Sequence, residues 1–373
     1  MGFSLPEFKP PNFERSPFTT APLVAFTEAE RQGVAPPNFH ATSIFPEYLQ
    51  LKKGEWTLLR DTRMDCAVVR EGETRLAVKE LRRIEAGDLV ACGRGENGEE
   101  GIYVQEDAFD LPRPSTEKFA FRVRPSRETS FSIDYDELYA LLEHEKRAGF
   151  ILWVSGPAVA FDHDARTALV ELIAKGYVHG LLAGNALAVH DLEADLFGTA
   201  LGQEIYTKRQ APLGHYRHLD AINRVRSAGS IEEAVRRGLV KGGIMHGIVK
   251  GSIPYVLAGS IRDDGPLPEV VRDVYEAQDR MRGLTRRATT VIALATQLHS
   301  IAVGNMVPSY TVTPDGTVRP VYFYTVDMSE FAVMKLMNRG SLAARSILTN
   351  VQDFVVTVAR GLEACARVGE SGA

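Results

Sequence analysis

The feature that most constrains the fold of this chain is a change of hydrophobic rhythm near Phe150. From there on, short apolar runs alternate with longer amphipathic stretches. Such alternation is typical of strands joined by crossover helices, and it predicts a parallel sheet with helices on both faces. The expected strands are 150–154, 177–182, 253–258, 290–294 and 320–326. We therefore expect an α/β domain over residues 150–373, doubly wound or close to it.

Helical patterns separate these expected strands. They lie at 165–175, 218–226, 231–250, 269–281 and 351–364, and a further one follows Val326 and extends to Met337. Pro268 is expected to open the helix at 269–281, because proline suits the first turn of a helix.

The N-terminal part of the chain has a different pattern. Residues 1–40 are rich in proline and phenylalanine with little periodicity, so we expect an extended arm that lies on another surface, such as that of a neighbouring subunit. Short β-type runs over residues 41–125 indicate a small barrel or sandwich. Residues 126–149 hold a polar link and then a charged amphipathic helix, which leads into the second domain.

Composition and charge exclude several classes of protein. The net charge of -5 over 373 residues provides no basic footprint for nucleic acid or an anionic membrane. Three scattered cysteines fit neither a disulfide framework nor a zinc site, and the histidine and acid spacings form no metal-binding set. No apolar window is long enough to span a membrane, and no signal segment begins the chain. We expect a cytoplasmic protein without a metal.

Small or polar residues follow four of the expected strands. In an open α/β sheet such strand ends meet at one edge, where backbone N–H groups and helix N-termini bind phosphates. Asp327 directly follows a strand and fits an acid that binds a ribose diol. No Gly-x-Gly-x-x-Gly occurs at any of these turns, and any single glycine here is also a plain strand end. The expected nucleotide-binding residues are Ser155, Gly156, Pro157, Gly184, Asn185, Ala186, Gly259, Ser260, Asp327 and Met328.

Titratable side chains gather on the same loops. The loop Ser260-Ile-Arg-Asp-Asp-Gly265 carries one guanidinium and two carboxylates, although its residues also suit a surface turn. His299 follows a buried strand and should face the cleft. The candidate catalytic residues are Asp264, Asp263, His299 and Arg262, and the candidate substrate-binding residues are Arg217, His190, Asp191 and Asn305.

Several long strings resemble those of the NAD-dependent ornithine cyclodeaminases of archaea and cyanobacteria, whose domain is often labelled lysine-oxoglutarate reductase/saccharopine dehydrogenase-like. The resemblance extends from about residue 39 onward. It implies a deoxyhypusine-synthase-like, Rossmann-like fold and a homo-oligomer, a dimer or tetramer, that holds NAD tightly and acts on a small amino acid. The strings are Leu181-Leu-Ala-Gly-Asn-Ala-Leu-Ala-Val-His-Asp191, Ala221-Ile-Asn223, Val256-Leu-Ala-Gly-Ser-Ile-Arg-Asp-Asp-Gly-Pro-Leu-Pro268 and Leu298-His-Ser-Ile-Ala-Val-Gly-Asn-Met306.

The resemblance also implies a reaction with no net redox change. Hydride leaves the substrate α-carbon for NAD⁺, the side-chain amine attacks the resulting imine, ammonia departs, and the cyclic imine takes the hydride back to give proline. We expect Asp264 or Asp263 to act as base or hold the ammonium, Arg262 or Arg217 to bind the carboxylate, and His299 to shuttle a proton. The alternatives are a net dehydrogenase of the opine or saccharopine type and a non-catalytic NAD-binding protein.

Two strings depart from the family pattern. Ala41-Thr-Ser-Ile-Phe-Pro46 stands where the family has Thr-Thr-Asn-His-Pro-Thr, and Gly243-Ile-Met-His-Gly247 stands where it has Gly-Ile-Met-Tyr-Glu. Losing polar recognition groups changes substrate discrimination, so a related amino acid is the alternative to ornithine. Residues 313–320 look inserted, and Asp315-Gly316 predicts a hairpin turn there.

Overall fold

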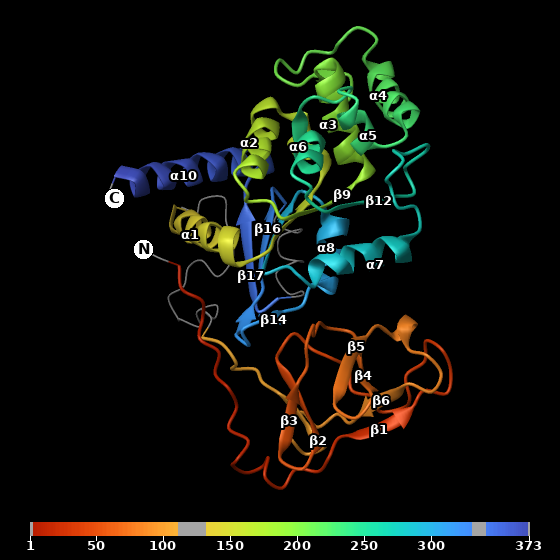
Figure 1. Cartoon of the computed structure of the whole chain (residues 1–373), viewed down its shortest axis with the longest axis vertical. Helices are drawn as coiled ribbons and strands as arrows, with labels where there is room; N and C mark the ends of the chain where they lie inside the picture. The colour runs from red at the N-terminus through yellow and green to blue at the C-terminus, as the bar shows by residue number, and fades with distance from the viewer. Residues whose placement is uncertain (1–2, 111–131, 330–340, 372–373) are drawn as a thin grey trace.

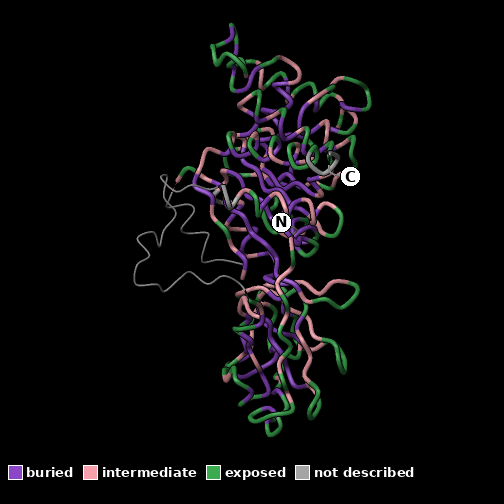
Figure 2. Tube along the Cα trace, turned by 90° about the vertical axis from the view of Figure 1, so that its left-hand side faces the viewer, coloured by how far each residue is buried: buried purple, intermediate pink, exposed green. Residues whose placement is uncertain are grey.

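The computed structural model describes residues 3–110, 132–329 and 341–371. A small β part lies at one end of an elongated molecule, and a larger α/β part lies at the other (Figure 1). Buried residues form a core inside each part (Figure 2). Within the described residues, no helix is long and apolar enough to cross a membrane.

The α/β part is built on one six-stranded sheet in which every neighbouring pair of strands is parallel. All five expected strands are present, which confirms the predicted α/β class, and a sixth strand that the sequence analysis missed lies at one edge. Numbered along the chain, the strands lie in the order 3-2-1-4-5-6. They are β12 (Tyr255–Ala258), β9 (Gly180–Gly184), β8 (Ile151–Ser155), β13 (Thr290–Leu294), β16 (Tyr322–Asp327) and β17 (Ala343–Leu348).

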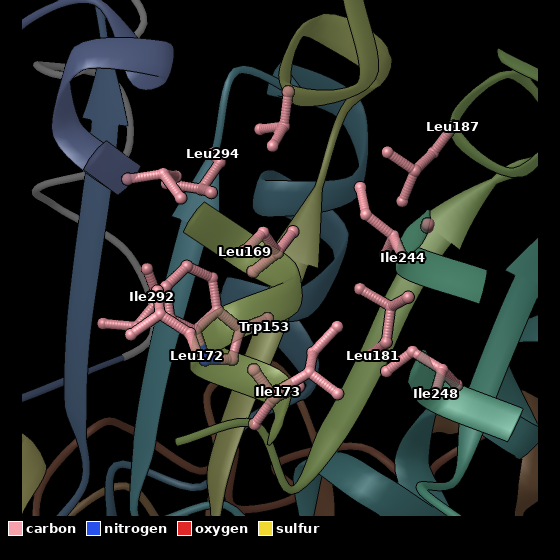
Figure 3. Close-up of a cluster of buried hydrophobic side chains, with 14 of the residues drawn as sticks. Trp153, Leu169, Leu172, Ile173, Leu181, Leu187, Ile244, Ile248, Ile292 and Leu294 are labelled. Carbon is pink, nitrogen blue, oxygen red and sulfur yellow. The ribbon is translucent and has the colours of Figure 1, made fainter. Parts of the chain in front are cut away.

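Helices cover both faces of the sheet, so its strands have no solvent-facing side and are continuous apolar runs. Along β8, Trp153 faces a core shared with α2 (His163–Ala174) and α6 (Gly243–Lys250), as Figure 3 shows. Its neighbours Leu152 and Val154 face the opposite core, which is formed with α7 (Val274–Thr285) and α8 (Gln297–Met306). Helices α1 (Ser132–Ala148) and α10 (Val351–Ser371) complete the first face.

Two expected helices differ from those observed. The expected helix at 269–281 begins only at Val274, because Val271 pairs with the sheet edge: its N–H donates to Leu257 O, and its carbonyl accepts from Gly259 N. Asp273 then caps α7 by accepting from two backbone N–H groups. The expected helix at 231–250 is two helices, α5 (Ile231–Arg236) and α6.

The remaining elements of the α/β part lie between β8 and α5. They are the 3-10 helix η2 (Pro157–Phe161), α3 (Asn185–Phe197), the short pair β10 (Thr199–Ala200) and β11 (Gln203–Glu204), and α4 (Gly214–Ala228). The helix that the sequence predicts after Val326 falls mainly at 330–340, outside the described residues.

The β part contains two antiparallel sheets, ordered β1-β6-β4-β5 and β3-β2-β7. The predicted N-terminal arm contributes β1 to the first sheet, and Phe13 of the arm stacks on Trp56 with ring centroids 4.8 Å apart. The described part of the arm therefore packs on this chain itself, chiefly on the β part, while Phe3 contacts Tyr322 of the α/β part. The elements are β1 (Ala25–Glu28), β2 (Glu47–Lys52), β3 (Glu55–Leu58), β4 (Ala67–Glu71), β5 (Arg75–Lys79), η1 (Leu81–Arg83), β6 (Leu89–Cys92) and β7 (Ile102–Val104).

Polar contacts join the two parts. Glu80 lies 2.6 Å from both the Arg63 and the Arg282 guanidinium nitrogens, so one carboxylate links the β part to α7. The Tyr310 hydroxyl donates to Leu59 O at 2.6 Å. Tyr310 begins the hairpin of β14 (Tyr310–Val312) and β15 (Val318–Pro320), which confirms the turn predicted at Asp315-Gly316.

Candidate active site

The strand order places the switch point of the sheet between the ends of β8 and β13. The chain leaves β8 towards one face of the sheet and leaves β13 towards the other, and ligands bind at such switch points in open α/β sheets. Gly156 N donates to Leu294 O at 2.9 Å, so the two strand ends touch here. Any Cβ on Gly156 would collide with the Ala295 carbonyl, and glycine is therefore required.

Two helices begin beside this switch point without a capping side chain. Gly184 is the N-cap of α3, Thr296 is the N-cap of α8, and neither makes a side-chain capping hydrogen bond. The first N–H groups of a helix are natural partners for phosphate, and the helix dipole favours negative charge there. Ala295 and Thr296 were missed by the sequence analysis, although the predicted strand at 290–294 pointed to them.

The other expected nucleotide-binding residues lie at the same edge of the sheet. Ser155 to Pro157 follow β8, Asn185 and Ala186 follow β9, Gly259 and Ser260 follow β12, and Asp327 and Met328 follow β16. The Asp327 carboxylate accepts from Ser329 N at 2.8 Å, and the side chain is half-buried. The structure thus brings together the strand ends that the sequence singled out.

Three polar side chains from three separate elements meet beside this edge. Asn185 Nδ2 lies 3.4 Å from Asp263 Oδ1, and Asn185 Oδ1 accepts from Leu267 N at 3.1 Å. The second oxygen of Asp263 accepts from Ser260 N at 2.8 Å. The His299 ring packs on Gly184, where Cε1 would lie 3.0 Å from an added Cβ. An amide, a carboxylate and an imidazole can together hold an amine and move its proton.

The electrostatics of His299 favour the neutral ring. Burial lowers the pKa of His299 below its ordinary value, and the nearby Asp263 carboxylate acts in the opposite direction. A neutral imidazole can accept a proton at physiological pH. His299 therefore has the protonation state that a general base needs.

Asp264 and Arg262 lie on the same loop but point elsewhere. Both are exposed, and within the described residues neither side chain has a hydrogen bond or an ion pair. The adjacent Ile261 is fully exposed. Of the two neighbouring carboxylates, Asp263 is the one that the fold turns towards Asn185 and His299.

His190 and Asp191 are engaged inside the protein. Asp191 is fully buried; its carboxylate accepts from Ile244 N at 2.9 Å and Met245 N at 2.8 Å, and pairs with Arg166 at 2.7 Å. These bonds anchor the start of α6. His190 Nδ1 lies 3.2 Å from Glu193 Oε2. The contacts of both residues are those of structural side chains.

Arg217 and Asn305 do not join the group of Asn185, Asp263 and His299. Arg217 lies on α4 and donates to Phe197 O at 3.0 Å. The Asn305 carbonyl, at the far end of α8 from His299, accepts from Arg63 of the β part. Within the described residues, no group of histidine, cysteine and acidic side chains could hold a metal ion.

The two departures from the family strings lie away from these strand ends. Gly247 is within α6, where an added Cβ would lie 3.2 Å from Ile173 of α2, so close helix packing accounts for this glycine. Ala41 forms a bridge with Ala67 in the β part.

Family models match both parts of the chain. The model described as "Arginine dihydrolase ArgZ-like, C-terminal, Rossmann fold" matches residues 138–358, which is more than half of the chain. The model described as "Arginine dihydrolase ArgZ-like, C-terminal, first region" matches residues 49–129.

Similar proteins cover nearly the whole chain. Ornithine cyclodeaminase of Methanocaldococcus jannaschii is 40% identical over 348 residues, which is 91% of this chain and 78% of the relative. The bifunctional arginine dihydrolase/ornithine cyclodeaminase ArgZ of Synechocystis is 35% identical, over 91% of this chain and 47% of the relative.

Solved structures agree with this fold. A LOR/SDH protein of Methanococcus maripaludis matches with a TM-score of 0.80 and 34% identity, over 93% of this chain and 99% of that one. AgrE in complex with ornithine and NAD⁺ matches with a TM-score of 0.56 and 31% identity, over 92% of this chain and 46% of that one. The chain is an enzyme that belongs to the ArgZ-like family of archaeal and cyanobacterial ornithine cyclodeaminases.

Proposed function

We propose that this protein is a redox-neutral, NAD-dependent cyclodeaminase that converts ornithine to proline and ammonia. The observation that carries the proposal is the grouping of Asn185, Asp263 and His299 beside the glycines at the switch point of the sheet. Relatives named ornithine cyclodeaminase, and a similar structure that holds ornithine and NAD⁺, support the same substrate and cofactor.

The residues at the switch point fit a dinucleotide. Gly156 and Gly184 have no side chains, so a ligand could approach the backbone closely at these strand ends. The first N–H groups of α3 and α8 have no capping side chain and could donate to a pyrophosphate. Asp327 is the acid that we propose for a ribose diol. When bound, NAD would accept hydride from the substrate α-carbon and return it to the cyclic imine, which gives proline.

Asp263 and His299 would handle the amine and its proton. Loss of hydride from the α-carbon requires a neutral amine, so a base must first remove a proton from the α-ammonium. We propose the neutral His299 ring for that proton and the Asp263 carboxylate for holding the ammonium. Ser260 N and Asn185 Nδ2 keep the two carboxylate oxygens of Asp263 oriented.

A cation must hold the substrate carboxylate. Arg262 has no ion-pair partner among the described residues and lies next to Asp263, whereas the guanidinium of Arg217 already donates to a backbone carbonyl. We therefore propose Arg262, which would turn inward when substrate binds. A bidentate guanidinium–carboxylate pair would also fix the orientation of the α-carbon.

The products distinguish this reaction from its alternatives. In the proposed cycle the side-chain amine replaces the α-amine, one ammonia is released, and the hydride that left the substrate returns. Purified protein incubated with NAD⁺ and ornithine should release ammonia and proline in equal amounts without accumulating NADH. NADH formed in step with product would instead indicate a net dehydrogenase. If neither product nor NADH forms with any amino acid of a panel, the proposal of an amino-acid cyclodeaminase fails.

We also propose that the enzyme is a cytoplasmic homo-oligomer, a dimer or tetramer. Leu213, Tyr216 and Leu219 are exposed apolar side chains on and beside α4, a surface that a second copy could cover. Cys66, Cys92 and Cys365 are unpaired, which suits a reducing compartment. Light scattering of the purified protein tests the assembly: a monomer at micromolar concentration would contradict it.

A further inference from the structure

A cavity lies at the start of β12, the strand whose other end leads to Asp263. Its volume is about 530 Å³, and it is lined by the entry to β12 together with α5, α6 and α7. Pockets of this size hold small organic molecules. A cavity of this volume is also far too large for a single bound water.

One wall of the cavity is apolar and the other is acidic. Ile248, Ile253 and Val256 provide the apolar wall. The acidic wall is formed by Glu232 and Glu269, and the Tyr255 hydroxyl donates to Glu232 Oε1 at 3.0 Å. Arg280 also lines the cavity, but its guanidinium pairs with Glu276. A ligand that satisfies both walls carries a hydrocarbon stem and a positive charge.

Glu269 lines this cavity and has an unfilled acceptor below the cavity surface. One carboxylate oxygen accepts from Ile231 N, whereas Oε2 is buried and has no hydrogen-bond partner within the described residues. Burial raises the pKa of Glu269, and the neighbouring Glu232 acts in the same direction. A buried acceptor without a donor is costly, and a cationic donor offsets that cost best.

The acidic wall is connected to the candidate active site through a short stretch of chain. Leu267 N donates to Asn185 Oδ1, which fixes the segment between Asp263 and Glu269. Two residues beyond Glu269, Val271 N donates to Leu257 O on the edge of β12. A ligand that moves Glu269 therefore acts on a segment anchored to the same Asn185 that contacts Asp263.

We propose that this cavity binds a small primary amine with an apolar stem, and that the ammonium lies between Glu269 and Glu232. The site is separate from the strand ends that would hold NAD, and it does not depend on the proposed reaction. Because a primary ammonium donates three hydrogen bonds, it can bridge the carboxylates of Glu269 and Glu232, which both line the cavity.

Titration calorimetry with n-pentylamine tests whether the cavity selects a ligand with a positive charge on a hydrocarbon stem. The amine should bind the full-length protein at least tenfold more tightly than 1-pentanol or pentanoate, which share the stem without the positive charge. Glu269→Gln should weaken amine binding about tenfold or more, since it removes the negative charge but keeps an acceptor for Ile231 N. Equal affinity for amine and alcohol would overturn the proposal.

Matched variants locate the bound amine. Glu233→Gln is the control, because Glu233 lies on the same helix but pairs with Arg236 and Arg237. It should leave amine affinity unchanged. Val249→Phe should abolish binding by filling the cavity, and circular dichroism verifies that each variant is folded. If binding survives Glu269→Gln and Val249→Phe but is lost in Asp263→Asn, the amine occupies the candidate active site and the proposal is wrong.

Discussion

The His299 ring lies directly against Gly184, so close that an added Cβ would be 3.0 Å from Cε1. The last residue of β9 therefore sets the position of the imidazole that we propose as base. The missing side chain of Gly184 leaves room for the ring. Its φ of -98° suits any residue, so the space for His299 and not the backbone conformation favours glycine here.

Gly184→Ala should displace His299 by a few tenths of an ångström or more. Because catalysis depends steeply on geometry, we expect kcat for ornithine to fall by about 10- to 100-fold. Steady-state kinetics measures the loss, and thermal unfolding measures any change in stability. Gly283→Ala is the control: this exposed helical glycine has no neighbour within 4 Å of an added Cβ, so activity should not change. Equal kcat values for the two variants would contradict the role of Gly184.

Neighbouring residues on one loop show where sequence reasoning reached its limit. The sequence predicted that 260–265 joins a strand end to the candidate site, which is how the chain folds. It left Asp263 and Asp264 equivalent, because the residue types are identical. Only the turn closed by Ser260 N decides that Asp263 faces inward.

The helix after this loop was misplaced for a related reason. Pro268 is locally a good first residue for a helix. However, the backbone of Val271 makes hydrogen bonds with the edge strand β12, so the helix begins only after the N-cap Asp273. A contact between residues far apart in the chain overrides the local preference. The strands were easier to predict because burial on both faces leaves a continuous apolar run in the sequence.

Asp263→Asn and Asp264→Asn form a pair that tests the assignment of the carboxylate. Asp263→Asn removes the charge that would hold the substrate ammonium, and we expect kcat/KM to fall at least 100-fold with NAD affinity unchanged. Asp264 is exposed, so Asp264→Asn should retain activity within about threefold. Kinetics and NAD titration of both variants measure this. The reverse pattern would assign the role to Asp264.

The titration of His299 provides a test that does not depend on turnover. Because burial lowers its pKa, NMR should show the ring losing its proton below pH 6.5, the ordinary value. Asp263→Asn should lower that pKa further, since the carboxylate favours the charged ring. A pKa at or above the ordinary value would exclude a neutral base.

The same shift has a consequence for stability. In the folded protein, His299 binds a proton only at a lower pH than it does in the unfolded chain. Its contribution to stability therefore falls as the pH drops below 6.5 and becomes constant below the pKa of the folded state.

Asp191 should prove to be a structural residue. Asp191→Ala would leave the Arg166 guanidinium, which is only 14% exposed, without its partner and would free two N–H groups at the start of α6. Breaking a buried ion pair costs about 3–5 kcal/mol, so we expect a loss of that order in the free energy of unfolding by urea. Glu171→Ala is the control, because Glu171 pairs with Lys175 on the surface and such pairs contribute about 0–1 kcal/mol. If Asp191→Ala instead kept full stability and lost only substrate affinity, Asp191 would belong to the substrate site.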